Sequence, residues 1–527
     1  MFGVACLNCR DSRKGEQCFE KALEIRMQHE SASSGGKKKT MSTSLDNLTE
    51  QDIRYQICQC RIQVQDYSRA LAVLQVVPLE QRSSKTLIAV AALYQREKNK
   101  SEAIKCYEQV LDHNPLALDA VLQLIRMDVK AADIIARIGP AMQTTVPASA
   151  MDLITSWIEV QACMHSYKTE RSVELARRLV GSQSHNSELL IALGQAYYLN
   201  GDHRKAIAVF KSLYAKDATL VKGMDTYAAA LAAENEVKVL EELTNRMIAR
   251  CESGEESPEP WIAVAYYTFL ACKKDSKALY FAQKACLASS NSIESLLLKA
   301  KIMSESKSAS EAIPYFVEAY TIAPFRFDVL KALTEAYVAE NKRSQASSMA
   351  AIAVRQFGPT PRALTLHASV LLTETEKVVN RKSAKNQLEK AVNKDRSYLP
   401  AVYALAKIYM DDKSYDKALE VLTKCMACLE HESANKLHRM LSECYTQVDD
   451  HVKAMHHQNI AKKLEVAYRA TTEAAQSLNA GTNHPAASRN VPAPDPAIDV
   501  DVDDLAESDN DEMEEGDVVW SDHFDDE

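Results

Sequence analysis

Glycine and aromatic residues are scarce in this chain of 527 residues, which holds 13 glycines and has 6% Phe, Trp and Tyr. Sheet proteins use glycine in tight turns and aromatic residues on strands, so this composition favours an all-helical fold. No run reaches the roughly 18 apolar residues that a membrane-spanning helix needs. The apolar run at residues 1–7 is too short for a secretory signal. We therefore expect no membrane partner.

The motifs that usually mark a catalytic or cofactor site are missing as well. The chain contains no G-x-G-x-x-G, no G-x-x-x-x-G-K-[ST] and no H-E-x-x-H, so neither a phosphate-binding loop nor a zinc protease helix is expected. Cys6 and Cys9 form a lone C-x-x-C pair, whereas a zinc site needs four ligands. Cys425 and Cys428 lie one helical turn apart, where packing explains them better. We predict no cofactor, no metal and no enzymatic activity.

Cysteines and histidines do not form a pattern that indicates chemistry. Several of the 13 cysteines lie on helix faces that we expect to be buried: Cys58, Cys106, Cys286 and Cys425. Buried free thiols act as small apolar groups, and together with the missing secretory signal they indicate a reducing compartment. Four histidines cluster near the last expected helices: His438, His451, His456 and His457. We expect these histidines to be solvated, since the neighbours His456 and His457 point about 100° apart.

What the chain does contain is a repeat. Alanines recur along it at nearly fixed intervals: Ala70, Ala103, Ala206, Ala278, Ala312, Ala346, Ala384, Ala418 and Ala454. From Ala278 onward the intervals are 34, 34, 38, 34 and 36 residues. A period of about 34 residues is typical of the tetratricopeptide repeat, a helix–turn–helix unit that stacks into a solenoid. A merely alanine-rich helical protein would not keep this phase over several hundred residues.

Residues 187–220 serve as the reference repeat. Gly194 and Tyr197 lie on the apolar stripe of its first helix, Gly201 marks the turn, and the second helix carries Ala206 and Phe210. The small residues allow the two helices to approach closely, and the large ones fill the space around them. Equivalent positions in later repeats are Ala278, Ala312, Phe316, Ala346 and Ala418. The predicted fold is an all-α tetratricopeptide-repeat solenoid, a right-handed superhelix of helix hairpins.

The repeat sets the expected domain organisation. Residues 1–30 are expected to form a partial N-terminal hairpin, and residues 31–48, rich in Ser, Gly and Lys, a flexible basic loop. The repeat array is expected over residues 49–470, followed by a linker at 471–496 and a disordered acidic tail at 497–527. Clear repeats are expected near residues 84–117, 187–220, 259–292, 293–326, 327–360, 363–398, 399–432 and 435–468. The stretch 116–147 is too degenerate for its helices to be placed.

Charge is divided unevenly along the chain. Residues 495–527 hold 16 Asp and Glu and no Lys or Arg; elsewhere, the 63 Lys and Arg exceed the remaining Asp and Glu by 7. This small surplus is not the focused basic patch of a nucleic-acid-binding protein, so no nucleic acid partner is expected. Four residues form an apolar island in the tail: Val518, Val519, Trp520 and Phe524. The island is either a short docking motif or incidental composition.

In such a solenoid the first helices line the inner surface, so their side chains determine which partners the array can bind there. Some tetratricopeptide proteins hold a partner's C-terminal carboxylate with a Lys–Asn pair at set positions of these helices. The equivalent pairs here include Ile191 with Gln195 and Lys331 with Glu335, and no repeat carries the Lys–Asn pair. The lining is mixed in charge and partly apolar, which predicts broad docking of a protein partner rather than a chaperone's peptide clamp.

Several segments outside the generic repeat positions resemble one family. They are residues 114–124 (NPLALDAVLQL), 221–227 (VKGMDTY), 258–262 (PEPWI), 278–285 (ALYFAQKA) and 311–324 (EAIPYFVEAYTIAP). In order and spacing, the chain from about residue 66 to residue 461 is similar to the family of the seventh subunit of the anaphase-promoting complex (cyclosome), a tetratricopeptide-repeat family. The acidic tail with its late tryptophan also agrees with that family.

The resemblance implies a non-catalytic scaffold subunit of a multi-subunit E3 ubiquitin ligase that acts at the metaphase–anaphase transition, in the nucleus and cytoplasm. Its partners would be other tetratricopeptide-repeat subunits of the same ligase. The family also implies a homodimer through the N-terminal repeats, and this chain departs from the family there, at Cys6, Cys9 and residues 31–40. The alternative function is a free tetratricopeptide adaptor that recruits short peptides in chaperone or trafficking work.

Overall fold

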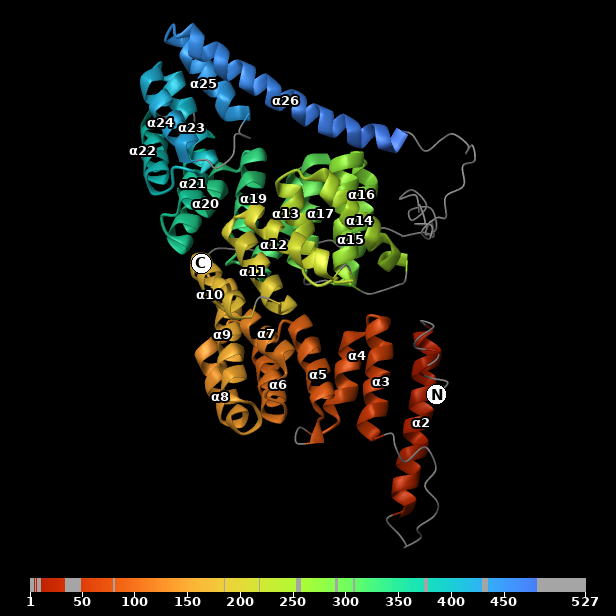
Figure 1. Cartoon of the computed structure of the whole chain (residues 1–527). Coiled ribbons are helices and arrows are strands. Elements are labelled where there is room, and N and C mark those ends of the chain that lie inside the picture. Colours follow the sequence, from red (N-terminus) through yellow and green to blue (C-terminus); the bar gives the residue numbers. More distant parts are fainter. Residues whose placement is uncertain are drawn as a thin grey trace. The chain divides into compact units, whose positions relative to one another are not determined.

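The computed structural model describes residues 4, 6, 11–33, 49–78, 81–183, 185–217, 219–252, 257–289, 292–306, 309–373, 378–428 and 435–480. All regular secondary structure in these residues is helical, as the composition predicts. The chain divides into two compact units, Met1–Ala192 and Leu193–Glu527, and in each the described residues form an array of helices packed one against the next (Figure 1). Within the described residues, no helix combines the length and the apolar character needed to cross a membrane.

The boundary between the units falls within α11 (Ser187–Asn200). The first unit contains α2 (Ser12–Ser33), α3 (Glu50–Gln63), α4 (Tyr67–Gln75), α5 (Ser84–Arg96), α6 (Lys100–His113), α7 (Leu118–Arg126), α8 (Ala131–Thr145), α9 (Ala148–Met164) and α10 (Thr169–Ser182). The second unit contains α12 (His203–Lys216), α13 (Met224–Ala233), α14 (Val237–Glu252), α15 (Pro258–Tyr267) with the π-helical turn η3 (Thr268–Cys272), α16 (Asp275–Ala288), α17 (Ile293–Ser306), α18 (Ala309–Ile322), α19 (Phe327–Ala339), α20 (Arg343–Phe357), α21 (Pro361–Thr373), α22 (Val378–Lys394), α23 (Leu399–Asp411), α24 (Tyr415–Cys428), α25 (Asn435–Gln447) and α26 (His451–Ala480).

Each stretch expected as a clear repeat holds one pair of consecutive helices. The pairs are α5–α6, α11–α12, α15–α16, α17–α18, α19–α20, α21–α22, α23–α24 and α25–α26. The degenerate stretch 116–147 holds α7 and α8, and α7 has only 9 residues. Odd-numbered helices from α3 onward are therefore the first helices of their hairpins, and even-numbered ones are the second.

A residue in the left-handed backbone conformation ends the first helix of most hairpins. These residues are Gln65, Lys98, Asp128, Gly201, Asn235, Lys273, Asn341, Lys413 and Asp449. In the α11–α12 turn, the amide of Gly201 donates to the carbonyl of Tyr198, and the amide of Asp202 donates to that of Tyr197. This pair of bonds is the Schellman motif, which satisfies the last carbonyls of a helix. Asp202 is also the N-cap residue of α12, so only Gly201 and Asp202 separate the two helices.

The N-terminal helix α2 packs against α3, the first helix of the following hairpin. Phe19 of α2 packs against Ile53 and Ile57 of α3. Arg61 of α3 forms ion pairs with Glu16 and Glu20 of α2, at 2.6 and 3.0 Å. The helix ends at Ser33, three residues inside the expected loop 31–48, whose other residues up to 48 lie outside the described part of the chain.

The C-terminal helix α26 is longer than the repeat period predicts. It covers 30 residues and ends at Ala480, so the helix extends ten residues into the segment expected as a linker, 471–496. The reason is local composition: residues 471–480 (TTEAAQSLNA) contain no Gly or Pro and are rich in good helix formers. Residues 481–527, which include the expected acidic tail, lie outside the described part.

The small residues that define the repeat lie inside the hairpins. Eight of the nine recurring alanines have no exposed surface, and Ala454 has 7%. Gly194 faces the ring of Phe210 so closely that a Cβ atom there would lie 2.7 Å from two ring carbons. Phe210 and Phe316 are buried, whereas Tyr197 is half-buried and its neighbour Tyr198 is buried.

Replacing Gly194 with Ala tests this close approach. The new methyl group would collide with Phe210, so we expect the free energy of unfolding to fall by about 1–3 kcal/mol. Gly181 in α10 is the matched control, because a Cβ there meets no atom within 4 Å. Gly181→Ala should leave stability unchanged or raise it by up to about 1 kcal/mol. Urea unfolding followed by circular dichroism measures both; equal stability of the two variants would contradict the packing.

Candidate interaction site

The first helices of the second unit form a shared face. Successive first helices contact one another, α13 with α15, α15 with α17, α17 with α19 and α19 with α21. In each of these five helices the second residue is charged: Asp225, Glu259, Glu294, Asp328 and Arg362. Because the hairpins repeat in register, these side chains recur at one end of neighbouring helices. We call them the charged row. A helix N-terminus favours the four carboxylates.

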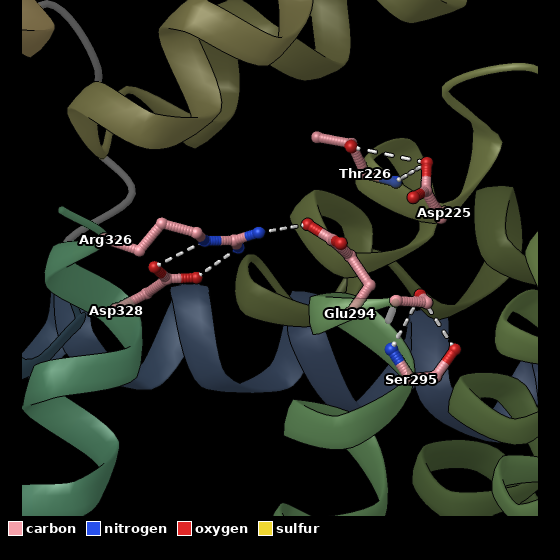
Figure 2. A network of polar contacts seen from close by, with 7 residues as sticks. Asp225, Thr226, Glu294, Ser295, Arg326 and Asp328 are labelled. Carbon is pink, nitrogen blue, oxygen red and sulfur yellow. Dashed lines mark hydrogen bonds and ion pairs between the residues drawn. The ribbon is translucent and has the colours of Figure 1, made fainter. Parts of the chain in front are cut away.

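Arg326 joins two members of the charged row (Figure 2). It is the N-cap residue of α19, and its side chain is 5% exposed. Its guanidinium binds Asp328 with two hydrogen bonds, Nε to Oδ1 at 3.1 Å and Nη2 to Oδ2 at 2.6 Å, and Nη1 donates to Glu294 of α17. Bidentate pairs of this kind are among the stronger charge-assisted hydrogen bonds. One arginine therefore connects α17 with α19.

The carboxylates of the charged row differ in their affinity for protons. Burial alone would raise the pKa of Asp328, but the charge and hydrogen bonds of Arg326, aided by Lys301 and Arg362, lower it to about 2. Among the described residues, no Lys or Arg forms an ion pair with Asp225: burial first, and then the charges of Glu294 and Glu259, raise its pKa. Asp225 accepts hydrogen bonds from the amide and hydroxyl of Thr226, in its own helix. Arg326 thus neutralises Glu294 and Asp328. Asp225 forms no such ion pair within the described residues.

Arg362 extends the charged row to a distant part of the second unit. Its Nη1 donates to the carbonyl of Leu199 at 3.0 Å, and its guanidinium lies 4.4 Å from the centre of the Phe327 ring. Gly201 is part of this contact, since a Cβ atom there would lie 2.8 Å from Cζ of Arg362. The hairpin turn after α11 therefore requires glycine for its left-handed φ of 88° and also for the approach of Arg362.

The histidines at the last hairpin are not all solvated, so that expectation is wrong. His438 of α25 is 5% exposed and His457 of α26 is 8% exposed. Their Nδ1 atoms lie 3.0 Å apart, and His457 stacks on Tyr445 with ring centres 5.6 Å apart. Burial, followed by the charges of His438 and His456, lowers the pKa of His457. A hydrogen bond between two Nδ1 atoms needs one protonated and one bare nitrogen, which two imidazolium ions cannot provide.

Several cysteines are poor nucleophiles because they are buried or, in the case of Cys286, which is expected to be buried, partly buried. Burial raises the pKa of Cys58 to about 12, and that of Cys60, Cys286, Cys425 and Cys444 to about 11. At neutral pH these thiols are protonated, and the thiolate is the reactive form. The described residues also contain no group of three or more His, Cys, Asp or Glu that could hold a metal ion.

The residues predicted from the repeat and the residues of the charged row are different sets. Repeat positions such as Ala278, Ala312, Ala346 and Ala418 lie between the helices of their hairpins, fully buried. The expected docking motif, Val518, Val519, Trp520 and Phe524, lies outside the described residues. The charged row was missed, although its members follow one another at intervals of 34, 35, 34 and 34 residues. The recurring alanines show the same period, so the spacing of these charged residues is a sequence signal for the row.

Sequence and structure comparisons with known proteins agree with one another. Sequence profiles of the tetratricopeptide repeat match residues 84–115, 168–220 and 399–427. The chain is 30% identical over 476 residues to anaphase-promoting complex subunit 7 of Homo sapiens, covering 90% of this chain and 80% of that protein. It is 23% identical over 462 residues to the protein of the same name from Arabidopsis thaliana, covering 84% and 80%. A solved structure with a similar fold is the APC/C hetero-tetramer Cut9–Hcn1, with a TM-score of 0.56 and 15% identity over 88% of this chain and 86% of that one.

Replacing Arg326 with Leu tests the ion pairs of the charged row. The change would leave Glu294 and Asp328 without their counter-charge, so we expect a loss of about 3–5 kcal/mol of unfolding free energy. Lys331→Leu is the control on the same helix: Lys331 and Glu335 form an ion pair with both side chains more than half exposed, and its loss should cost at most about 1 kcal/mol. Chemical denaturation of the full chain measures both, and a loss below 1 kcal/mol for Arg326→Leu would contradict the assignment.

Acidification should loosen the last hairpin. The pKa of folded His457 is lowered, so below the ordinary histidine pKa of about 6.5 the unfolded chain binds more protons than the folded one. Stability from this group is therefore complete above about pH 6.5 and declines as the pH falls. We expect amide hydrogen exchange in α25 and α26 to accelerate between pH 7.5 and pH 5.5, after correction for intrinsic rates. His457→Phe should remove this dependence, and His113→Asn, on an exposed site, should not.

Proposed function

The chain belongs to the anaphase-promoting complex subunit 7 family, and from this premise we propose that it is a scaffold subunit of an anaphase-promoting complex with no catalytic activity of its own. The observation that carries the proposal is the length of the similarity, which covers 90% of the chain and so includes both units. A match confined to repeat positions would indicate only the fold, and one fold serves many functions.

The proposed partners are other tetratricopeptide-repeat subunits of the same complex. Support comes from the fold shared with Cut9–Hcn1, an APC/C hetero-tetramer. In this proposal the complex is an E3 ubiquitin ligase of the cell-division cycle that acts at the metaphase–anaphase transition, and the subunit resides in the nucleus and cytoplasm. The subunit holds other subunits in place and does not contact the reacting thioester.

The chemistry of the buried cysteines supports a role without thioester catalysis. A residue that carries ubiquitin as a thioester has to be an accessible thiol of low pKa, whereas the thiols of Cys58, Cys60 and Cys425 are buried and their pKa values are raised. The arginines at the charged row are engaged by carboxylates, a carbonyl and an aromatic ring. Arrays of stacked hairpins present long surfaces to protein partners, which suits a scaffold.

Affinity purification of the tagged full chain from dividing cells tests the assignment. We expect the chain to co-migrate in gel filtration with a large assembly, and cross-linking mass spectrometry to identify other anaphase-promoting complex subunits next to it. Recovery of the chain only as a free species, or only with chaperones and short peptides, would instead support the adaptor function. Light scattering of the purified chain gives its copy number, and a dimer would support the homodimer that the family implies.

A reconstituted reaction tests the absence of catalysis separately. The chain alone, with ubiquitin, activating enzyme and conjugating enzyme, should form no conjugates above background. Adding the chain to a complex that lacks it should restore assembly without changing the conjugating enzyme's own thioester chemistry. Conjugate formation by the isolated chain would contradict the proposal.

A further inference from the structure

A groove on the first unit is formed by α3, α4 and α5. It has a volume of about 330 Å³, within the range of sites that bind small ligands or single large side chains. Its lining includes Tyr55 and Ile62 of α3, Tyr67 of α4 and Ile88 of α5. Ile88 is 41% exposed, so apolar surface faces solvent in the groove. Exposed apolar surface of this kind favours a partner with an apolar side chain.

Two cations border the groove. The Nζ atom of Lys85 lies 4.1 Å from the centre of the Tyr55 ring, and the guanidinium carbon of Arg96 lies 3.9 Å from the centre of the Tyr67 ring. The aromatic rings hold the two side chains in place through cation–π contacts. Neither Asp nor Glu occurs among the residues that line the groove. The charges are therefore positioned but not neutralised within it, which favours an anionic partner.

The spacing of the two cations sets the length of the partner. Lys85 and Arg96 lie 11 residues apart on α5, which is about 16 Å along a helix axis and almost the same direction around it. An extended peptide covers that distance in about five residues, at 3.3 Å per residue. The partner should therefore be an extended segment with two acidic residues five positions apart and an apolar, aromatic centre.

The acidic tail of this chain carries that pattern. Asp517 and Asp522 are five positions apart and enclose Val518, Val519 and Trp520. We propose that residues 517–522 dock in the groove of α3, α4 and α5, with the two aspartates at Lys85 and Arg96 and the Trp520 side chain in the apolar hollow. The proposal explains why an apolar island stands in an otherwise acidic segment, and it is independent of the scaffold assignment.

The test follows Trp520 in the full chain labelled with 5-fluorotryptophan. Of the three tryptophans, the ¹⁹F signal of Trp520 is assigned by Trp520→Phe, and Trp157 and Trp261 serve as internal references. We expect Trp520 to be protected from a neutral paramagnetic quencher at low salt and exposed at high salt. In the double variant Lys85→Glu/Arg96→Glu, the equilibrium constant for docking of the tail should fall by about tenfold or more. Two partly exposed ion pairs are then replaced by pairs of like charge.

Two further variants decide the outcome. Lys211→Glu/Lys238→Glu makes the same change of charge at exposed sites of α12 and α14 and should leave Trp520 protected. Asp517→Lys/Asp522→Lys, added to Lys85→Glu/Arg96→Glu, should restore protection by exchanging the charges. Exposure of Trp520 in the unaltered chain would overturn the proposal, because the groove would then be free or meant for another protein's acidic segment. Protection that persists in Lys85→Glu/Arg96→Glu would also overturn it, since the tail would dock elsewhere.

Discussion

The left-handed residue in the hairpin turns is the constraint on which the rest of the structure depends. It lets the chain reverse within a few residues, with the last carbonyls of the first helix satisfied by a Schellman motif. The same turn recurs from Gln65 to Asp449, so hairpins along the chain have closely similar geometry. Because the hairpins repeat this geometry, one alanine of each second helix lies at the close contact between the two helices of its hairpin. For the same reason the first helices of neighbouring hairpins share a face.

The charged row follows from this regularity. A charged residue at the second position of five successive first helices becomes a column of charges, because neighbouring helices are in register. Four carboxylates side by side would repel one another, and Arg326 and Arg362 are placed where they offset that repulsion. Buried ion pairs rarely add much net stability compared with apolar packing. Their effect here is to specify which helices lie next to each other, since a change of register between α17 and α19 would leave Glu294 without Arg326.

The sequence is sufficient to predict the hairpins but not the contacts between distant repeats. The alanine period identifies the second helices because a small residue is needed wherever two helices touch. Turn residues such as Lys98 and Lys413 carry no comparable signal, since lysine has no preference for the left-handed conformation and tertiary packing imposes it. The pair of His438 and His457 is not predictable from the adjacent histidines of α26, because it depends on a side chain of the preceding helix, α25. The contact of Arg362 with Leu199 depends on the curvature of several repeats, which no local pattern encodes.

That last contact has a consequence for how the second unit folds. In an open repeat array each element touches only its neighbours, so either end can unravel by itself and the array forms step by step. Arg362 joins a backbone carbonyl 163 positions earlier, and the intervening repeats have to be in place before the bond can form. Non-local closure of this kind slows folding. It also couples the ends of the enclosed stretch, so the repeats from α11 to α21 should be lost together, as a cooperative block with a high barrier to unravelling.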